Sequence, residues 1–415
     1  MLIDSQKETE KFVMDRLGAP LLCFLIAVSA IGPLTLNGVL PATSAVMTEL
    51  ATRYEVAQLV LTVFLVANLV SQLVLGPAAD RYGRRPVMLF SLSVFVVGSL
   101  ICASANSIEW LLAGRFVQGV GGAVCVFLPR TIVRDIYEQG RAASVIGYMT
   151  TAMMVAPLFG PALGGWITDH ASWRLMYAGL ACLGILLLLA GWRYQPETLV
   201  SLRSKPSTAP GTSFFASSGL LLRDPGFVAC GCMLAGSVGV YYGFLSGAPY
   251  LAMESRGLSA TDYGRWFGMV AIGYLCGNLA AGKLSERLGV QKMIFMGFLP
   301  FLAGVALFWI LLPLHHPVAL FMPMMLAAFS NGMSLPSMFT VAMSIRPELS
   351  ASASGLAGSL QTAFGVVLSI AIGYLLPMGD YWLFVLLTLS ASISVVGLGL
   401  TIRLTRRQQI SVARH

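Results

Sequence analysis

Residues 76–86 read GPAADRYGRRP, a short polar stretch between two long apolar runs. A second stretch, GKLSERLGVQK at 282–292, aligns with the first at an offset of 206 residues. The alignment pairs like residues at four positions, namely Gly76 with Gly282, Asp80 with Glu286, Arg81 with Arg287 and Gly83 with Gly289. The second copy is degenerate, with Val290 and Gln291 in place of Arg84 and Arg85. We interpret the two stretches as one loop that occurs twice, in two halves that repeat in parallel.

Long apolar runs with almost no charge surround both copies of the loop. The chain is 57% hydrophobic and 11% charged, whereas a soluble domain carries about 25% charged residues. A run of about 18 or more apolar residues predicts a membrane-spanning helix. Turn signals and charges divide the chain into twelve such spans, at about 19–41, 56–79, 87–105, 109–129, 142–166, 173–194, 226–250, 263–282, 293–313, 317–340, 354–376 and 382–402. The predicted fold is an all-α membrane protein with twelve transmembrane helices in two pseudo-symmetric six-helix halves.

The polar segments set the predicted domain boundaries. The longest of them, 195–225, contains several Pro, Ser and Thr residues and separates the two halves. The predicted organisation is a cytoplasmic tail at 1–18, a six-helix half at 19–194, a central cytoplasmic loop at 195–225, a second half at 226–402 and a cytoplasmic tail at 403–415. The first 18 residues mix acidic and basic side chains and precede no small-residue cleavage site, so we expect a tail and not a signal peptide.

The positions of the charges explain the net charge of +8. With the N-terminus inside, 21 of the 26 Lys and Arg residues fall on the cytoplasmic side of the predicted spans. This asymmetry follows the positive-inside rule and predicts that both termini are cytoplasmic. The positive charge therefore reports topology and does not indicate nucleic-acid binding. The sequence has no GxxxxGKS/T pattern, no zinc-ligand spacing and no convincing catalytic triad. We expect no catalytic residue, no metal site and no cofactor.

Three sequence patterns in the first half are typical of one transporter family. The 76–85 segment has the pattern Gly-x-x-x-Asp-Arg-x-Gly-Arg-Arg. Span four contains Arg115, Gln118 and Gly119 in an Arg-x-x-Gln-Gly pattern. Span five contains Pro157, Gly160, Pro161, Gly164 and Gly165. These patterns resemble the cytoplasmic loop signature of the major facilitator superfamily, its second motif, and the motif of its drug–proton antiporters.

Finer matches resemble one branch of that family, the bicyclomycin-resistance and chloramphenicol exporters. They are LPA at 40–42, IVRD at 132–135, SGAPY at 246–250 and GLSATDYG at 257–264. The resemblance implies a transporter of the bacterial inner membrane that exports a small-molecule substrate by alternating access, in exchange for protons. We expect it to act as a monomer in the lipid bilayer.

The first copy of the loop also has a physical logic of its own. Glycines permit a tight turn, and an arginine cluster needs anionic partners, for which Asp135 at the inner end of span four is suitable. The candidate latch consists of Gly76, Asp80, Arg81, Gly83, Arg84, Arg85 and Asp135. We interpret it as an inter-helix latch that locks the outward-closed state and releases on rocking, with Asp80 near the start of span eleven at Gly355. The alternative is a basic loop that only sets topology.

Spans five and eight carry faces of small residues. These are Gly160 and Gly164 in span five, and Gly273 and Gly277 in span eight. In lipid, helices associate by close packing, and small residues let their backbones approach. We expect the two faces to meet across the halves. The alternative is that each face packs against an unrelated neighbour.

The candidate substrate cavity is formed by amides, aromatic residues, a methionine and one arginine within the spans. Its members are Asn37, Arg115, Gln118, Tyr148, Met154, Tyr241, Tyr242 and Asn331. Methionine and aromatic side chains suit an adaptable apolar pocket, although such residues more often lie in the core or face lipid.

One expected residue is missing from this cavity. Relatives of the branch commonly carry an aspartate in span one where this chain has Asn37. All 18 Asp and Glu residues fall in loops, tails or helix ends, although a proton relay normally uses an intramembrane acid. Arg115 lies at a similar predicted depth and lacks an acidic partner. Either carbonyls, Gln118 and water satisfy it, or the cavity is net positive and suits neutral or anionic substrates.

The expected function is export of small amphipathic drugs or metabolites by alternating access, with proton antiport. A second possibility is an exporter or facilitator of neutral or anionic metabolites without obligatory proton coupling. A possibility from another class is a non-transporting membrane receptor or sensor.

Overall fold

The computed structural model describes residues 2–136, 145–146, 149, 152–198, 214–346 and 349–412, and within these ranges every regular element is a helix. The first half contains α1 (Leu2–Gly38), α2 (Thr43–Glu49), α3 (Tyr54–Ala57), α4 (Leu59–Tyr82), α5 (Arg84–Ala103), α6 (Ile108–Ile136), α8 (Val155–His170) and α9 (Trp173–Tyr194). The second half contains α11 (Phe214–Leu222), α12 (Pro225–Tyr250), α13 (Ala260–Leu311), α14 (Val318–Ser344), α15 (Ser350–Leu375) and α16 (Tyr381–Val412). Short helical turns at Leu40–Ala42, Leu251–Ser255 and Leu376–Met378 adjoin α1, α12 and α15.

The lengths of these helices agree with the predicted membrane spans. Eleven segments of the described chain are long and apolar enough to cross a membrane, and α13 supplies two of them, Ala260–Ser285 and Arg287–Leu311. The predicted span at 142–166 is represented by α8, whose 16 residues follow a stretch that lies largely outside the described residues. The predicted tail at 1–18 is helical, because α1 runs from Leu2 to Gly38 without a break.

The repeated loop has the same backbone feature in both copies. Gly83 has φ +112° and Gly289 has φ +76°, and both values lie in a region that residues with a side chain rarely adopt. Gly83 separates α4 from α5, and Gly289 bends α13 between its two spans. The offset between the two copies therefore corresponds to a structural equivalence, because the same turn of each half uses a glycine with positive φ.

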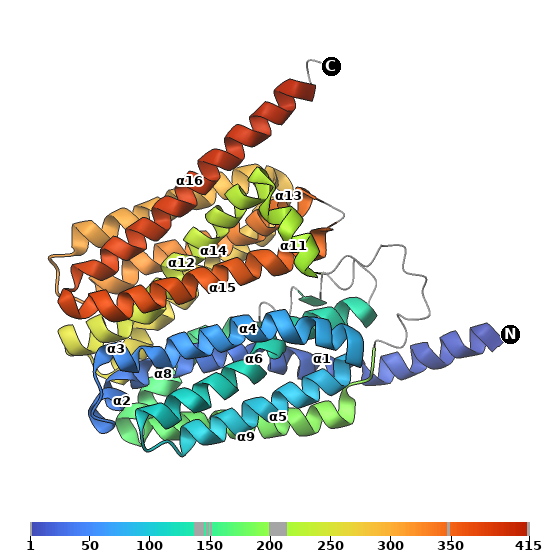
Figure 1. The fold of residues 1–415 in the computed structure, drawn as a ribbon, viewed down its shortest axis with the longest axis horizontal. Coiled ribbons are helices and arrows are strands. Elements are labelled where there is room, and N and C mark those ends of the chain that lie inside the picture. Colours follow the sequence, from blue (N-terminus) through green and yellow to red (C-terminus); the bar gives the residue numbers. More distant parts are fainter. Residues whose placement is uncertain are drawn as a thin grey trace.

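The two halves form two layers of helices (Figure 1). The first half has a core around Phe95 and Tyr177, and the second has a core around Phe244 and Tyr263. Both termini lie at the same end of the bundle, where α1 and α16 project beyond the other helices. We call this end the terminus end. The opposite end, which holds α2 and α3, is called the hairpin end.

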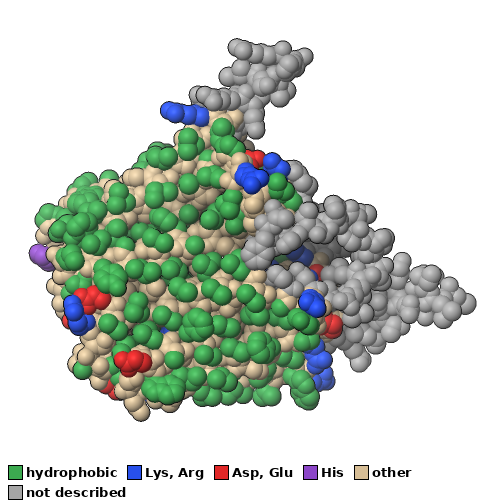
Figure 2. Space-filling view, viewed as in Figure 1, with side chains coloured by type: hydrophobic (Ala, Val, Ile, Leu, Met, Phe, Trp, Pro, Cys, Tyr) green, Lys and Arg blue, Asp and Glu red, His purple; other side chains and the backbone are tan. Residues whose placement is uncertain are grey.

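The sides of the bundle expose large apolar side chains. Leu299 is 71% exposed and Val74 is 60% exposed. Figure 2 shows hydrophobic side chains over most of one face, with charged groups gathered near the two ends. Soluble monomers rarely expose apolar patches of this extent, whereas a lipid-facing surface requires them. The fold is that of a multi-pass membrane protein.

Candidate functional site

Hydrogen bonds join the two halves near the hairpin end. In the described part of the chain they pair Asn37 with Tyr241, Ser44 with Glu254, Tyr54 with Ser246, Gln58 and Thr62 with Ser369, and Asp169 with Ala260 and Thr261. At the terminus end, a Cβ on Gly76 of α4 or on Gly358 of α15 would meet no atom within 4 Å, so nothing packs closely against either glycine. The structure therefore has a joined hairpin end.

Asn37 takes part in this contact between the halves. It lies one residue before the end of α1 and is 2% exposed. Its Nδ2 donates to the Pro33 carbonyl at 2.8 Å, and its Oδ1 accepts from the Tyr241 hydroxyl of α12 at 3.1 Å. A buried polar group without a partner costs about 1–3 kcal/mol, so Tyr241 stabilises the joined state. The described contacts of Asn37 do not include Arg115.

Arg115 is buried in α6, and its described partners all belong to the first half. Its Nε donates to the Val60 carbonyl at 3.0 Å, and its Nη1 donates to Gln118 Oε1 at 2.6 Å. The guanidinium also lies 4.3 Å from the centre of the Phe64 ring. Gln118 continues this chain by donating to Ser99 of α5 at 2.8 Å. Carbonyl, amide and aromatic contacts thus offset the burial of this cation, as one of the two sequence interpretations proposed.

The other predicted cavity residues lie on several helices. Tyr242 lies beside the tyrosine that binds the α1 amide, with 6.1 Å between the two ring centres. Asn331 of α14 is 2% exposed and exchanges hydrogen bonds with Ser237 of α12, so its amide is satisfied within the second half. Met154 is the partly buried residue that precedes α8. Tyr148 lies outside the described residues.

The predicted antiporter motif lies on α8, at Pro157, Gly160, Pro161, Gly164 and Gly165. Its glycines allow α8 to touch helices on two sides. Gly160 and Gly164 face α1, and a Cβ on Gly164 would collide with the carbonyl oxygen of Gly38. Gly165 faces the start of α13, where a Cβ would collide with the backbone of Ala260. α8 is therefore packed against both halves at the hairpin end.

Spans five and eight do touch, but not through the two predicted faces. The contact uses Pro161 of α8 and Gly264 of α13, where a Cβ would meet the proline carbonyl. Gly273 and Gly277 instead face α14. The prediction that their face meets that of Gly164 is wrong. A small-residue face permits close approach but does not specify which neighbouring helix it meets.

Asp169, near the end of α8, binds the N-terminus of α13. Its carboxylate accepts from the backbone N–H of Thr261 at 2.7 Å and of Ala260 at 3.3 Å. Burial acts to raise the pKa of this carboxyl, but hydrogen bonding by Thr261 and Ala260 outweighs burial and holds the pKa below its ordinary value. Asp169 is therefore ionised at neutral pH and fixes the positive end of α13 to the first half.

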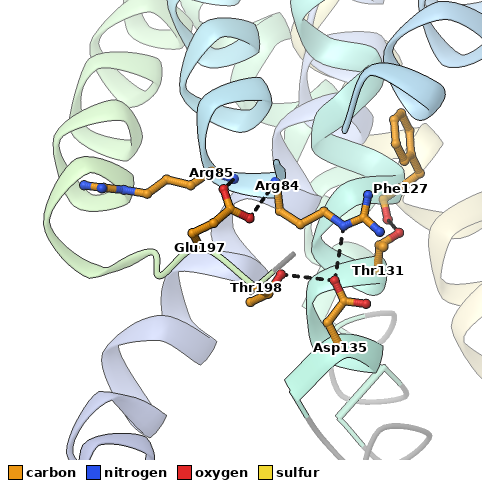
Figure 3. A network of polar contacts seen from close by, with 7 residues as sticks. All are labelled: Arg84, Arg85, Phe127, Thr131, Asp135, Glu197 and Thr198. Atoms are coloured by element: carbon orange, nitrogen blue, oxygen red, sulfur yellow. Dashed lines mark hydrogen bonds and ion pairs between the residues drawn. The ribbon is translucent and has the colours of Figure 1, made fainter. Parts of the chain in front are cut away.

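The predicted latch residues lie at the terminus end. Arg84 Nε and Asp135 Oδ2 form an ion pair at 3.1 Å, with side chains only 7% and 9% exposed (Figure 3). Arg81 is exposed near the end of α4, and Gly76 lies earlier in the same helix. Asp80 is also on α4, but its side chain is not among those described. The structure thus brings together Arg84 and the acid expected to pair with the arginine cluster.

Glu197 belongs to the same network and was not predicted from the sequence. Its carboxylate accepts from the backbone N–H of Arg84 at 3.0 Å and of Arg85 at 3.2 Å, so it caps the N-terminus of α5 (Figure 3). Thr198 donates to Asp135 at 3.1 Å, and Arg85 donates to a backbone carbonyl near the end of α9 at 2.7 Å. The start of the segment between the halves is thereby fixed to the first half. The only sequence signal for this role of Glu197 was its position just after span six, at the same predicted membrane boundary as the basic 76–86 loop.

Known proteins similar to this chain are transporters. Residues 22–370 match the sequence model of the Major Facilitator Superfamily. The chain is 30% identical over 387 residues to multidrug resistance protein D of Escherichia coli K12, covering 91% of this chain and 94% of the relative. It is 29% identical over 366 residues to YdgK, an uncharacterized MFS-type transporter of Bacillus subtilis 168, covering 86% and 90%. It is 28% identical over 266 residues to the multidrug transporter MdfA of Yersinia pestis, covering 64% of each chain.

Solved transporter structures have the same fold. The xylose transporter XylE from E. coli, in a partially occluded inward open conformation, gives a TM-score of 0.72 at 13% identity, covering 92% of this chain and 97% of XylE. A bacterial homologue of the human lysosomal transporter Spinster gives a TM-score of 0.66 at 17% identity, covering 93% and 95%. These likenesses confirm the predicted fold of two six-helix halves. The chain therefore belongs to the major facilitator superfamily and is a membrane transporter, not an enzyme.

Proposed function

We propose that this transporter exports small amphipathic drugs or metabolites from the cytoplasm of a bacterium by alternating access. It works as a monomer in the inner membrane, and the terminus end is the cytoplasmic end. The distribution of Lys and Arg along the chain supports this orientation through the positive-inside rule. Relatives named as multidrug transporters support the class of substrate.

The joined hairpin end is the observation that carries the proposal. The cross-half hydrogen bonds described above gather at that end, while at the terminus end nothing packs within 4 Å of a Cβ built on Gly76 or Gly358. Such an arrangement suits a state that receives substrate from the cytoplasm. Alternating access then requires the hairpin end to separate as the terminus end closes.

The proposed substrate surface has an apolar and a polar part. Tyr241 and Tyr242 lie beside the interface on α12, and Met153 and Met154 precede α8 on the other side. Aromatic rings and thioethers adapt to ligands of different shape, and the tyrosine hydroxyls add hydrogen bonds. This combination supports small amphipathic molecules rather than sugars or metal ions.

We further propose that the 76–86 loop acts as a latch that locks the outward-closed state. The buried pair of Arg84 and Asp135 and the cap from Glu197 support this role, because they hold α5, α6 and the segment after α9 together. Movement of α5 relative to α6 during the transport cycle has to strain or break this network.

Proton antiport is the coupling that the family resemblance favours. A second candidate function, transport without obligatory proton coupling, is favoured by Asn37, because an amide does not titrate. Among the described residues, each carboxylate lies in the N-terminal part of α1 before its apolar run, at a helix end, at a loop or near the bend of α13. Export of one negative charge is itself favoured by about 2.3 kcal/mol per 100 mV of inside-negative potential, so an anion could leave without a proton in exchange.

Proteoliposomes with a pH-sensitive dye test both candidates. Matched cationic, neutral and anionic aromatic compounds are added, and compound movement and proton movement are measured together. Antiport predicts coupled and opposite fluxes, whereas the second candidate predicts compound flux without proton flux. Protein-free liposomes and the Gly164→Leu variant serve as controls. Wild-type protein that moves none of these compounds would contradict the export proposal.

A further inference from the structure

Arg130 of α6 lacks the partners that a buried arginine normally has. It is partly buried two turns before the end of the helix, and among the described residues the hydrogen-bond partner of its Nη2 is the Met153 sulfur, at 3.8 Å. Its Nε is buried and has no hydrogen-bond partner in the described part of the chain. A thioether is a weak acceptor, and none of the described carboxylates forms an ion pair with this guanidinium. Arg115 on the same helix differs, because its burial is offset by carbonyl, amide and ring contacts.

The surroundings of Arg130 come from both halves of the transporter. Tyr274 of α13 lies close enough to interact with it electrostatically, as does Arg134 one turn further along α6. Asn278 lies one turn beyond Tyr274 and donates to its carbonyl at 3.1 Å. Neither Arg130 nor Arg134 forms an ion pair with a described carboxylate, and the tyrosine hydroxyl is a hydrogen-bond donor from the opposite half.

We propose that Arg130 and Tyr274 form a subsite for the anionic group of a transported compound, a carboxylate or sulfonate on an aromatic body. The inference rests on the proposed export function and deepens it by naming the charge of the substrate. A guanidinium presents a planar set of donors that matches a carboxylate, and an anion placed there supplies the missing hydrogen bonds. Met153 and the tyrosine ring provide apolar contacts for the body of the ligand.

This subsite also connects binding to movement. Arg130 belongs to the first half and Tyr274 to the second, so one bound anion contacts both. An anion held between them draws α6 and α13 together away from the joined hairpin end. A lipophilic cation is repelled from the same place, so the subsite discriminates between charges as well as between shapes.

Binding to purified protein in detergent tests the subsite without requiring transport. The probes are 2-naphthoate and its neutral counterpart 2-naphthamide, measured by calorimetry. Because a hydrogen bond to a charged group strengthens binding, wild-type protein should bind 2-naphthoate roughly tenfold more tightly than 2-naphthamide. This preference should disappear in Arg130→Met. Arg130→Lys should keep part of it. Arg134→Met, which removes an exposed charge one turn away, should change it less than about twofold.

Thermal unfolding of the same variants separates binding from a structural role. Removal of an unsatisfied buried charge should leave the melting temperature of Arg130→Met unchanged or higher. The inference is overturned if wild-type protein shows no preference for 2-naphthoate, or if the preference survives in Arg130→Met. Charge preference with no flux in proteoliposomes would instead count against the export function and leave the subsite standing.

Discussion

Asp135→Asn tests how strongly the network at the terminus end holds the first half together. The Arg84 and Asp135 side chains are 7% and 9% exposed, so loss of one charge leaves the other buried without compensation. Breaking a buried ion pair in this way costs about 3–5 kcal/mol. We expect the lower value, about 3 kcal/mol, because the new amide oxygen can still accept from Thr198.

The matching assay is thermal unfolding in detergent, followed by tryptophan fluorescence. For a unit of 150–250 residues, 1 kcal/mol shifts the melting temperature by about 2–4 °C, so a loss near 6–12 °C is expected. Asp262→Asn is the control, since it removes the same charge from an exposed ion pair. The side chain of Asp262 is 50% exposed and that of its partner Arg265 is 73% exposed. Exposed pairs contribute about 0–1 kcal/mol, and the control should shift by less than about 4 °C.

A double substitution completes this test. Arg84→Met combined with Asp135→Leu replaces the ion pair by apolar groups and should recover much of the stability lost by either single change. The reasoning is refuted if Asp135→Asn melts no lower than Asp262→Asn. It is also refuted if the two single losses simply add in the double variant, because independent residues would behave in that way.

Three further predictions concern the hairpin end. Gly164→Leu should abolish transport because α1 leaves no room for a side chain, whereas Gly179→Leu, with no atom within 4 Å of its Cβ position, should be tolerated in the same drug-efflux assay. Asp169→Ala should loosen the joined state, raising thiol labelling of a cysteine placed at Ser44 from outside. In wild type, the ionised carboxylate of Asp169 stabilises the joined state. Because the pKa of Asp169 is lowered, this stabilisation is fully present above the ordinary carboxyl pKa and is lost as the pH falls through the lowered pKa. Labelling of wild-type protein should therefore rise only in strong acid. Asn37→Asp should make efflux more pH-dependent and shift it toward ethidium-like cations over neutral phenicols, and an unchanged ratio would count against a role in charge selection.

Properties that depend on sequence periodicity were predictable. Hydropathy predicted the order of the spans, and eleven of the twelve are long and apolar enough in the described chain, since lipid accepts only helices of sufficient length. The repeat predicted two equivalent loops, and Gly83 and Gly289 have positive φ at the equivalent position. The pairing of Arg84 with Asp135 followed from the need of a basic cluster for an acid at the same membrane boundary.

Properties that depend on contacts between distant segments were not predictable. The face of Gly164 fits any close neighbour, and only the tertiary arrangement selects α1. Glu197 lies just after α9 in a segment without hydrophobic periodicity, so no sequence pattern indicated that it caps α5. The predicted span that contains Arg115 stopped at residue 129, whereas α6 continues to Ile136 and so includes Arg130.

The hydrogen bonds at the hairpin end give a physical reason for an amide at Asn37. Each such bond contributes about 0.5–1.5 kcal/mol net, and moving a two-state equilibrium from 99:1 to 1:99 takes about 5.5 kcal/mol. Loss of a few of these bonds, with new ones formed elsewhere, is therefore enough to reverse the state. Tyr241 lies farther from the end of α12 than Ser246, the other α12 residue that binds the first half. A ligand between the halves can thus compete for Asn37 and Tyr241 before it reaches the outer contacts. An amide in this position makes opening responsive to the ligand without any need for a titrating group.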